Sequence, residues 1–266
     1  MPDSTPSRLH PARHTTARLS LGRTGTTVPT EDHLRFQLDH ALARDAVHAQ
    51  LDTNLLLQGL RERNLEPILL HSAAPDRRTY LRRPDLGRTL DSNSIAALRK
   101  AVISTEAQRS GETSVFGTAT PASIRLLFIL ADGLSALAVE RHALPLLDAT
   151  LPLLIPDPCP PIPVVQNARV AIGDPIGQLL NANLTILLIG ERPGLSSPDS
   201  LGAYLTWSPH PRRTDAERNC ISNIRGTEGL GYTEAAHRIA HYIAEAHRLQ
   251  TTGIALKDPS TISLLH

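Results

Sequence analysis

The sequence predicts an α/β protein with a mainly helical first part, followed by a Rossmann-like or flavodoxin-like domain with a parallel sheet. Two observations carry this prediction. In the first half apolar residues recur at helical spacing, whereas in the second half continuous apolar runs alternate with helical stretches. Such alternation favours parallel strands joined by right-handed crossovers. A chain of 266 residues is long enough for two parts, each with its own core.

The chain divides into three predicted segments. Residues 1–16 are rich in Pro, Ser, Thr, His and Arg and lack the apolar core of a secretory signal, so we expect a disordered lead-in. Residues 17–118 form the helical domain and residues 119–266 the sheet domain. We place their junction within residues 106–121, which carry Ser, Gly and Thr without periodicity.

Two helices are expected in the first part. Thr30 is placed as an N-cap, with Glu31 and Asp32 in the first turn. The apolar stripe of this helix consists of Leu34, Leu38, Leu42 and Val47. Another helix starts near Asn93 or Ser94. Its expected buried face consists of Ile95, Leu98 and Val102.

Five strands are expected in the second part. The continuous apolar runs predict buried strands at residues 125–131, 162–169 and 184–190, and shorter runs predict strands at 203–207 and 220–224. Between the first two strands, a helix with Leu137, Leu144, Leu147, Leu151 and Leu154 in its stripe should bend at Pro145. Asp174 and Pro175 predict the N-cap and first residue of a short helix. A last helix from Thr233 turns Ala236, Ile239, Ile243 and Ala246 inward.

Open sheets of this kind bind ligands beyond the carboxyl ends of their strands. The candidate segments are residues 132–135, 170–174 and 191–194 and the region of Cys220. No P-loop sequence is present, and the nearest approach to a dinucleotide fingerprint, residues 229–234, lacks the third glycine. The sequence therefore predicts a crevice without a standard nucleotide motif.

Three side-chain groups each allow two interpretations. Cys220 is either a thiol activated by Arg212 and Arg218 or, as we favour, a small strand residue. Histidines 237, 241 and 247 could chelate a metal, but a solvated helix face is favoured because no HExxH pattern is present. Glu191 follows a buried strand, where its carboxylate can meet a ligand or cap the loop, and position alone favours neither. The charged turn at residues 82–88 is expected to be a solvated or subunit-contact surface.

Composition excludes several classes of protein. The 27 basic and 26 acidic residues nearly balance, and the single Trp207 leaves no base-stacking surface, so nucleic acid is not an expected partner. No apolar stretch reaches the roughly 18 to 20 residues that span a membrane. Cys159 and Cys220 lie far apart without a CxxC pair, which argues against a disulfide framework or a structural zinc site. We therefore expect a cytoplasmic location.

Five short sequences resemble the ethanolamine ammonia-lyase small-subunit family in their order and spacing. They are Leu-Gly-Arg-Thr-Gly (21–25), Tyr-Leu-Arg-Arg-Pro-Asp-Leu-Gly-Arg (80–88), Ala-Asp-Gly-Leu-Ser (131–135), Gly-Glu-Arg-Pro-Gly-Leu (190–195) and Cys-Ile-Ser-Asn-Ile (220–224). The resemblance extends from about residue 17 to residue 257, and five ordered motifs are far more specific than one. It implies a subunit of a carbon–nitrogen lyase that converts ethanolamine to acetaldehyde and ammonia with adenosylcobalamin.

The resemblance also implies a division of labour between two chains. The substrate site belongs to the large subunit, and cobalamin is held between the large and small subunits in a hetero-oligomer. The implied cobalamin contacts of this chain are Val170, Glu191 and Cys220, and no catalytic or metal-binding residue is expected. One residue is missing relative to the family between Glu191 and Cys220, which shifts the expected place of Cys220.

Two further expectations accompany the resemblance. No Asp-x-His-x-x-Gly sequence occurs, so cobalt should keep dimethylbenzimidazole as its lower ligand, without a histidine from this chain. The family is linked to ethanolamine degradation and to bacterial microcompartments, although residues 1–16 show no amphipathic helix that would serve as a targeting signal. The alternative is a stand-alone Rossmann-like, nucleotide-binding enzyme that uses Glu191 or Cys220 chemically.

Overall fold

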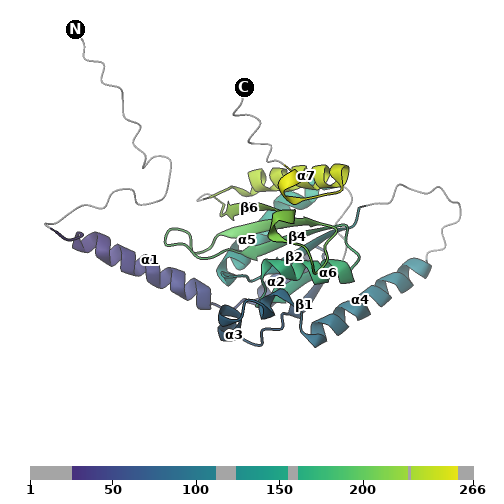
Figure 1. Ribbon diagram of the computed structural model, residues 1–266, viewed down its shortest axis with the longest axis horizontal. Helices are drawn as coiled ribbons and strands as arrows, with labels where there is room; N and C mark the ends of the chain where they lie inside the picture. Colours follow the sequence, from purple (N-terminus) through teal and green to yellow (C-terminus); the bar gives the residue numbers. More distant parts are fainter. Residues whose placement is uncertain (1–25, 112–123, 155–160, 227–228, 257–266) are drawn as a thin grey trace, which may run out of the picture.

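One six-stranded sheet with helices on both faces organises the protein (Figure 1). The computed structural model describes residues 26–111, 124–154, 161–226 and 229–256, so the predicted lead-in 1–16 lies outside the described residues. The strands are β1 (Pro67–His71), β2 (Leu126–Ala131), β3 (Ile162–Gln166), β4 (Leu184–Gly190), β5 (Leu201–Trp207) and β6 (Arg218–Ile224). The α-helices are α1 (Thr30–His48), α2 (Thr53–Glu62), α3 (Arg77–Arg82), α4 (Ser92–Gly111), α5 (Ala136–Thr150), α6 (Gly173–Leu179) and α7 (Tyr232–Leu249). The 3-10 helices are η2 (Leu86–Arg88), η3 (Leu151–Leu153), η4 (Val170–Ile172), η5 (Asp215–Glu217) and η6 (Gly253–Ala255). The predicted α/β class is confirmed.

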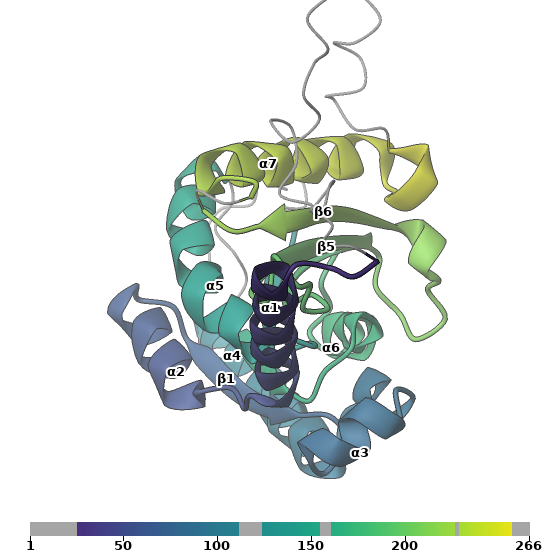
Figure 2. The same cartoon turned by 90° about the vertical axis from the view of Figure 1, so that its left-hand side faces the viewer.

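β2 and β4 form the apolar centre of the sheet, as their continuous apolar sequences predict. Every residue of both strands is buried. Because successive side chains of a strand point to opposite faces, each strand contributes to two cores. Leu126 and Phe128 pack on the face that α2, α5 and α7 cover, whereas Leu127 and Ile129 pack on the face of α4 and α6. Figure 2 shows α5 and α6 on opposite sides of the sheet.

The sheet is mixed, so the prediction of a parallel sheet is wrong for its last two strands. In the strand order β1-β3-β2-β4-β5-β6, the first four strands are parallel. β5 runs antiparallel to β4, and β6 antiparallel to β5. The connection from β4 to β5, residues 191–200, contains no helix. A parallel neighbour needs a crossover of about a dozen residues or more, usually helical, whereas an antiparallel one needs only a loop.

β1 was not predicted, and it comes from the part of the chain that was expected to be helical. It is a five-residue edge strand that pairs with β3. Only Leu70 is fully buried, and Leu69 is 45% exposed, so β1 lacks the continuous apolar run that marked the central strands. The boundary predicted between residues 118 and 119 lies outside the described residues and stays a prediction.

The helix starts differ from prediction at two places. α1 begins at Thr30 itself, with Pro29 as N-cap and no side-chain cap, and α6 begins at Gly173 with Ile172 as N-cap. The predicted N-caps Thr30 and Asp174 are therefore wrong. Asp174 lies inside the first turn of α6 because the helical backbone already begins in η4, and its carboxylate binds a buried arginine. The short length of α6, seven residues, is confirmed.

The remaining helices follow prediction with changes in detail. α5 continues through Pro145 to Thr150. Its core face includes Val139, Ala143 and Leu146, while the predicted Leu137 and Leu144 are half-buried. α7 turns Ala236, Ile239, Ile243 and Ala246 inward, as expected. The predicted strand 162–169 ends at Gln166, and β5 and β6 each begin two residues before their predicted starts.

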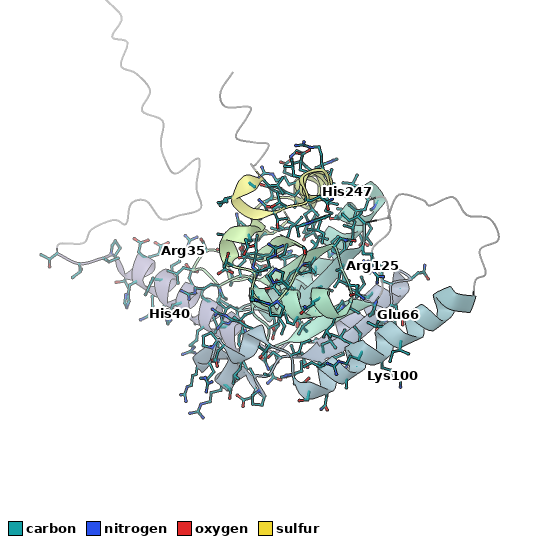
Figure 3. All side chains as sticks on the ribbon, turned by 45° about the vertical axis from the view of Figure 1, so that its right-hand side comes forward. Arg35, His40, Glu66, Lys100, Arg125 and His247 are labelled. Carbon is teal, nitrogen blue, oxygen red and sulfur yellow. The ribbon has the colours of Figure 1, made fainter. Side chains whose placement is uncertain are left out.

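α1 and α4 project from opposite sides of the sheet (Figure 1). Three leucines at helical spacing on α1 are at least half exposed: Leu34 at 58%, Leu38 at 59% and Leu42 at 50%. Figure 3 shows Arg35 and His40 on α1 and Lys100 on α4. Near its start, α4 packs through the buried Leu98, with Ile95 and Val102 half-buried. None of the described helices is long and apolar enough to cross a membrane.

Candidate functional site

The carboxyl ends of β2, β3 and β4 meet at one edge of the sheet. β2 is followed through α5 by β3 on one side, and β3 is followed through α6 by β4 on the other side of β2. The strand order thus reverses around β2, which is where open α/β sheets place a ligand crevice. The segments after these strands are residues 132–135, 167–172 and 191–200.

Asp132 joins the ends of β2 and β3. Its buried carboxylate accepts hydrogen bonds from the amides of Asn167 and Ala168, at 2.8 and 2.9 Å. Arg77 forms an ion pair with it at 3.2 Å and also donates to the carbonyl of Gly133. Burial raises the pKa of Asp132, although Arg77 and the amides oppose that rise. Because Asp132 is only 3% exposed, its carboxylate joins the ends of the two strands and is closed to a ligand.

Two glycines allow the loops after β2 and β4 to touch. Gly133 has a φ of +56°, and a Cβ atom there would lie 2.1 Å from the carbonyl oxygen of Gly190. A Cβ atom on Gly190 would meet the carbonyl oxygen of Ser135 at 2.0 Å. Any larger residue at either position would force the two loops apart.

Glu191 lies directly after β4 and ties it to β5 and β6. Its carboxylate accepts from the Ser200 hydroxyl at 2.5 Å, the Ser222 hydroxyl at 2.6 Å and the Asn223 amide at 3.2 Å. Asn223 has a φ of +60° beside a register shift between β5 and β6. The structure thus provides the loop-capping role that was one of the two interpretations. Because a carboxylate has about four acceptor positions, three internal donors leave room for one ligand donor.

Asp199, which the sequence analysis missed, anchors the loop of Glu191 to other segments of the chain. Asp199 accepts from Arg225 and Arg141, both at 2.9 Å, and lies 3.3 Å from His142. Burial opposes ionisation of Asp199, but the two arginines outweigh it and lower the pKa. The Ser135 hydroxyl donates to the carbonyl of Pro198 in the same loop. These contacts join residues 26 to 63 positions apart, so no local sequence pattern predicts them.

Cys220 lies exposed on β6, opposite Tyr204 of β5. Desolvation of the thiol by neighbouring atoms raises its pKa to about 11, the negative charge of Glu191 adds to the rise, and a hydrogen bond with Tyr204 opposes it. Arg218 does not lower this pKa, because Asp174 binds its guanidinium. The interpretation of Cys220 as an activated thiol is therefore not supported.

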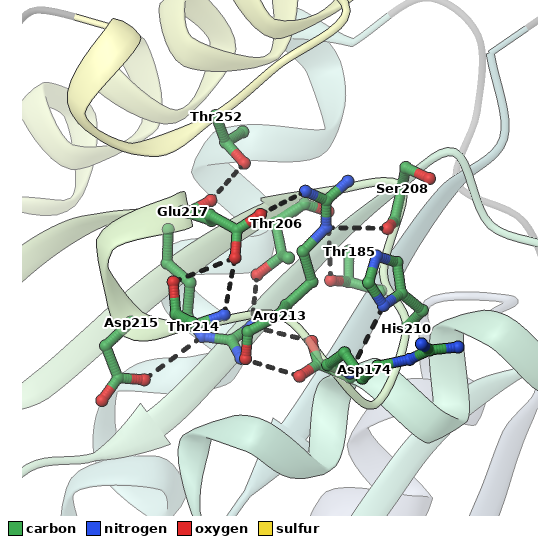
Figure 4. A network of polar contacts seen from close by, with 12 residues as sticks. Asp174, Thr185, Thr206, Ser208, His210, Arg213, Thr214, Asp215, Glu217 and Thr252 are labelled. Atoms are coloured by element: carbon green, nitrogen blue, oxygen red, sulfur yellow. Dashed lines mark hydrogen bonds and ion pairs between the residues drawn. The ribbon is translucent and has the colours of Figure 1, made fainter.

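A buried ion pair joins α6 to the antiparallel strands (Figure 4). Arg218 of β6 binds both carboxylate oxygens of Asp174, each at 2.7 Å, and donates to the hydroxyl of Thr206 at 2.9 Å. The two charged side chains are only 3% and 2% exposed. Such a pair fixes α6 against β5 and β6, together with η4, which directly precedes α6 in the sequence.

Val170 begins η4 between β3 and α6 and is half-buried. It lines a cavity of about 850 Å³ on the α6 side of the sheet. A second cavity, of about 600 Å³, lies at the carboxyl edge itself. It is lined by α1 through His40, Ala43, Arg44, Val47 and His48, by Leu81 and Leu134, by Arg169 and by residues 192–195. Arg169 borders both cavities.

Of the three predicted contact residues, two lie near each other and the third lies apart from them. Glu191 and Cys220 are close enough for the carboxylate to raise the pKa of the thiol. Val170 lies in η4, directly before α6, and lines a different cavity, but its neighbour Arg169 reaches the cavity beside the loop of Glu191. Sequence reasoning missed α1 as a wall of this cavity.

Comparisons with known proteins agree over nearly the whole chain. A family model described as ethanolamine ammonia-lyase light chain (EutC) matches residues 8–257. An ethanolamine ammonia-lyase small subunit from Pseudomonas aeruginosa is 48% identical over 253 residues, covering 94% of this chain and 87% of the relative. That from Pseudomonas putida is 50% identical with the same coverage. That from Azotobacter vinelandii is 48% identical over 271 residues, covering 100% of this chain and 94% of the relative.

Proposed function

The chain belongs to the ethanolamine ammonia-lyase light-chain family, and from this premise we propose that it holds adenosylcobalamin against a large catalytic subunit. The assembled enzyme would be a carbon–nitrogen lyase that converts ethanolamine to acetaldehyde and ammonia. The family match over residues 8–257 carries the proposal. No residue of this chain is assigned to catalysis.

The crevice region has the chemistry that a corrin requires. Val170 offers an apolar contact for the flat macrocycle, and the remaining acceptor position of Glu191 suits an amide donor on the corrin rim. Cys220 is exposed and can pack as a small, soft side chain. The Nε of Arg169 is buried and has no hydrogen-bond acceptor in the described part of the chain. When bound, adenosylcobalamin supplies the radical chemistry of the reaction.

Two finer features accompany the proposal. The reversal of strand order around β2 supports a Rossmann-like ligand site, even though β5 and β6 are antiparallel. The cofactor is proposed to bind with dimethylbenzimidazole on cobalt, because the chain lacks an Asp-x-His-x-x-Gly sequence.

We further propose that α1 contacts the large subunit. Its exposed Leu34, Leu38 and Leu42 form a row of leucines at four-residue spacing without a partner in the described chain. The same helix lines the cavity at the carboxyl edge through Arg44 and Val47. A large subunit that covers the cofactor therefore also reaches α1, and the exposed leucines would lie in its interface.

Reconstitution from separately purified chains tests the proposed function. Ethanolamine deamination should require this chain, a large subunit and adenosylcobalamin together. The stand-alone nucleotide-binding enzyme is not favoured, because the Glu191 carboxylate is held by internal donors and the pKa of Cys220 is raised. Cofactor-independent turnover by the chain alone would contradict the proposal.

A further inference from the structure

The cavity beside Val170 is lined by unbalanced charge. It has a volume of about 850 Å³ and is bounded by η2, α4, α6 and the segment that leads into η5. Its charged lining residues are Arg88, Arg99, Arg169, Arg213, Asp174 and Asp215. Four cations and two carboxylates thus line one cavity.

The two carboxylates and one of the cations are already neutralised by neighbours. Asp174 forms the buried pair with Arg218, and Asp215 lies 3.4 Å from the same guanidinium. Arg213 pairs with Glu217 at 2.5 Å. These contacts leave the positive charge of the other three lining arginines uncompensated.

Arg88, Arg99 and Arg169 have no ion pair within the described part of the chain. Arg88 and Arg99 are exposed at the mouth, one from η2 and one from α4. Three guanidinium groups around a single cavity repel one another, and an oxyanion between them removes that repulsion. Guanidinium groups bind phosphate oxygens in a bidentate geometry.

Arg169 is held in place before any ligand arrives. Its guanidinium stacks over the ring of Tyr80, with 4.4 Å between the guanidinium carbon and the ring centroid. Tyr80 is fixed by a 3.0 Å hydrogen bond from its hydroxyl to the carbonyl of Ala168. Gly87 makes room for this stack, since a Cβ atom there would lie 2.9 Å from Cγ of Arg169 and 3.0 Å from the ring. The Nε of Arg169 is buried without a hydrogen-bond acceptor, and its terminal nitrogens donate no hydrogen bond within the described chain.

The rest of the lining is largely apolar. The apolar lining residues are Pro84, Leu90, Ile95, Val170, Ala171, Pro175, Leu179 and Pro211. A ligand that fits both parts of the lining carries an anionic group on a larger, less polar body. We propose that this cavity binds a phosphate ester, whose oxygens are held by Arg88, Arg99 and Arg169.

Two kinds of ligand carry such a phosphate group. One is the cofactor, through the phosphodiester in its nucleotide tail, and the other is a free phosphate ester. The cofactor is the favoured source because Val170, a proposed cofactor contact, lines the same cavity. That choice of source rests on the proposed function, whereas the phosphate site itself does not.

The first experiment measures inorganic phosphate binding to the full chain alone, by calorimetric titration at constant ionic strength with chloride as reference. The wild-type chain should bind phosphate saturably, and Arg88→Gln/Arg99→Gln should weaken binding by about tenfold or more. Both residues are exposed, so this variant should keep its fold. Arg35→Gln is the matched control, because it removes an exposed positive charge from α1, outside the cavity. It should bind phosphate within about twofold of the wild type.

The second experiment identifies the source in the complex with the large subunit. Affinities are measured for adenosylcobalamin and for adenosylcobinamide, which lacks the phosphate and its nucleotide. If the cavity binds the phosphate of the cofactor, Arg88→Gln/Arg99→Gln lowers the affinity for adenosylcobalamin by about tenfold and leaves the affinity for adenosylcobinamide unchanged. Equal affinities of variant and wild type for adenosylcobalamin, together with lost phosphate binding, would assign the site to a free phosphate ester.

The phosphate site is overturned if the wild-type chain shows no saturable phosphate binding. It is also overturned if Arg35→Gln loses as much affinity as the cavity variant. Failure of the complex to bind adenosylcobalamin would contradict the proposed function, but the phosphate titration of the chain alone would still decide the site.

Discussion

Glu191 joins structure and proposed cofactor binding in one side chain. Glu191→Gln keeps one acceptor oxygen but loses the charge, so we expect cofactor affinity of the complex to fall by about 1 to 3 kcal/mol. An absorbance titration of the complex with adenosylcobalamin measures this change. Ser222→Ala is the matched control, because it removes a donor to Glu191 and leaves the carboxylate. If both variants lose thermal stability and neither loses cofactor affinity, Glu191 is a loop cap only.

Cys220 should react slowly as a nucleophile near neutral pH. The raised pKa of about 11 means that the reactive thiolate fraction increases with pH and reaches half only near pH 11. The pH dependence of iodoacetamide alkylation measures this midpoint, with the peptide that contains Cys220 quantified by mass spectrometry. A midpoint near pH 8, below that of an ordinary thiol, would restore the activated-thiol interpretation.

Asp174 and Arg218 stabilise the chain as a pair. Asp174→Asn leaves a buried guanidinium without its counter-charge, so the free energy of unfolding should fall by about 3 to 5 kcal/mol. Urea unfolding of the chain measures the loss. Asp85→Asn breaks the exposed pair with Arg83 and should change the unfolding midpoint little. Equal effects of the two substitutions would show that burial does not set the strength of the first pair.

At the residue level, the apolar runs predicted only which segments lie near the sheet crevice. The resemblance selected Val170, Glu191 and Cys220 within those segments, and their contacts with a cofactor stay a prediction. The Asp174–Arg218 pair could not be predicted, because its partners are 44 residues apart and Asp174-Pro175 looks like a helix start. The capping of Glu191 by Ser222 depends on a register shift that no local sequence feature specifies.

At the scale of elements, α1 carries the clearest prediction. Leu38→Glu places a charge in its exposed apolar face, so affinity for the large subunit should fall by about tenfold or more. Ile254→Glu is the matched control, because Ile254 is 88% exposed in η6 beyond the end of α7. Co-purification with a tagged large subunit, followed by a binding titration, compares the two. Unchanged assembly of Leu38→Glu would remove α1 from the interface.

The strands show what sequence patterns can and cannot determine. β2 and β4 were predicted because both faces are buried, which requires an uninterrupted apolar run. The direction of β5 was missed because an apolar run has the same composition in either direction, and only the helix-free connection of residues 191–200 distinguishes the two. β1 was missed because an edge strand with one fully buried residue needs little apolar sequence.

At the scale of the whole molecule, the buried polar network holds a scaffold around an open crevice. Asp132 and Asp199 each bind an arginine from another segment and fix the loops at the carboxyl edge. The Asp174–Arg218 pair lies beside Thr206, level with the start of β4, and fixes α6 there. Uncompensated positive charge and exposed apolar residues remain on the outside, at the cavity beside Val170 and on α1. This arrangement is consistent with the proposed roles of holding a cofactor and contacting a partner.

The most direct test of the central claim is an adenosylcobalamin titration of the complex that carries Cys220→Trp, followed by visible absorbance. Cys220 is exposed but its thiol contacts Tyr204, so assembly with the large subunit is measured first to check that the fold tolerates the indole, which should occupy the proposed place of the corrin. Ala244→Trp adds the same ring to an exposed position on α7 as the control. The account predicts that Cys220→Trp still assembles with the large subunit but loses cofactor affinity by about tenfold or more, while Ala244→Trp binds normally. Wild-type cofactor affinity in an assembled Cys220→Trp complex would contradict it.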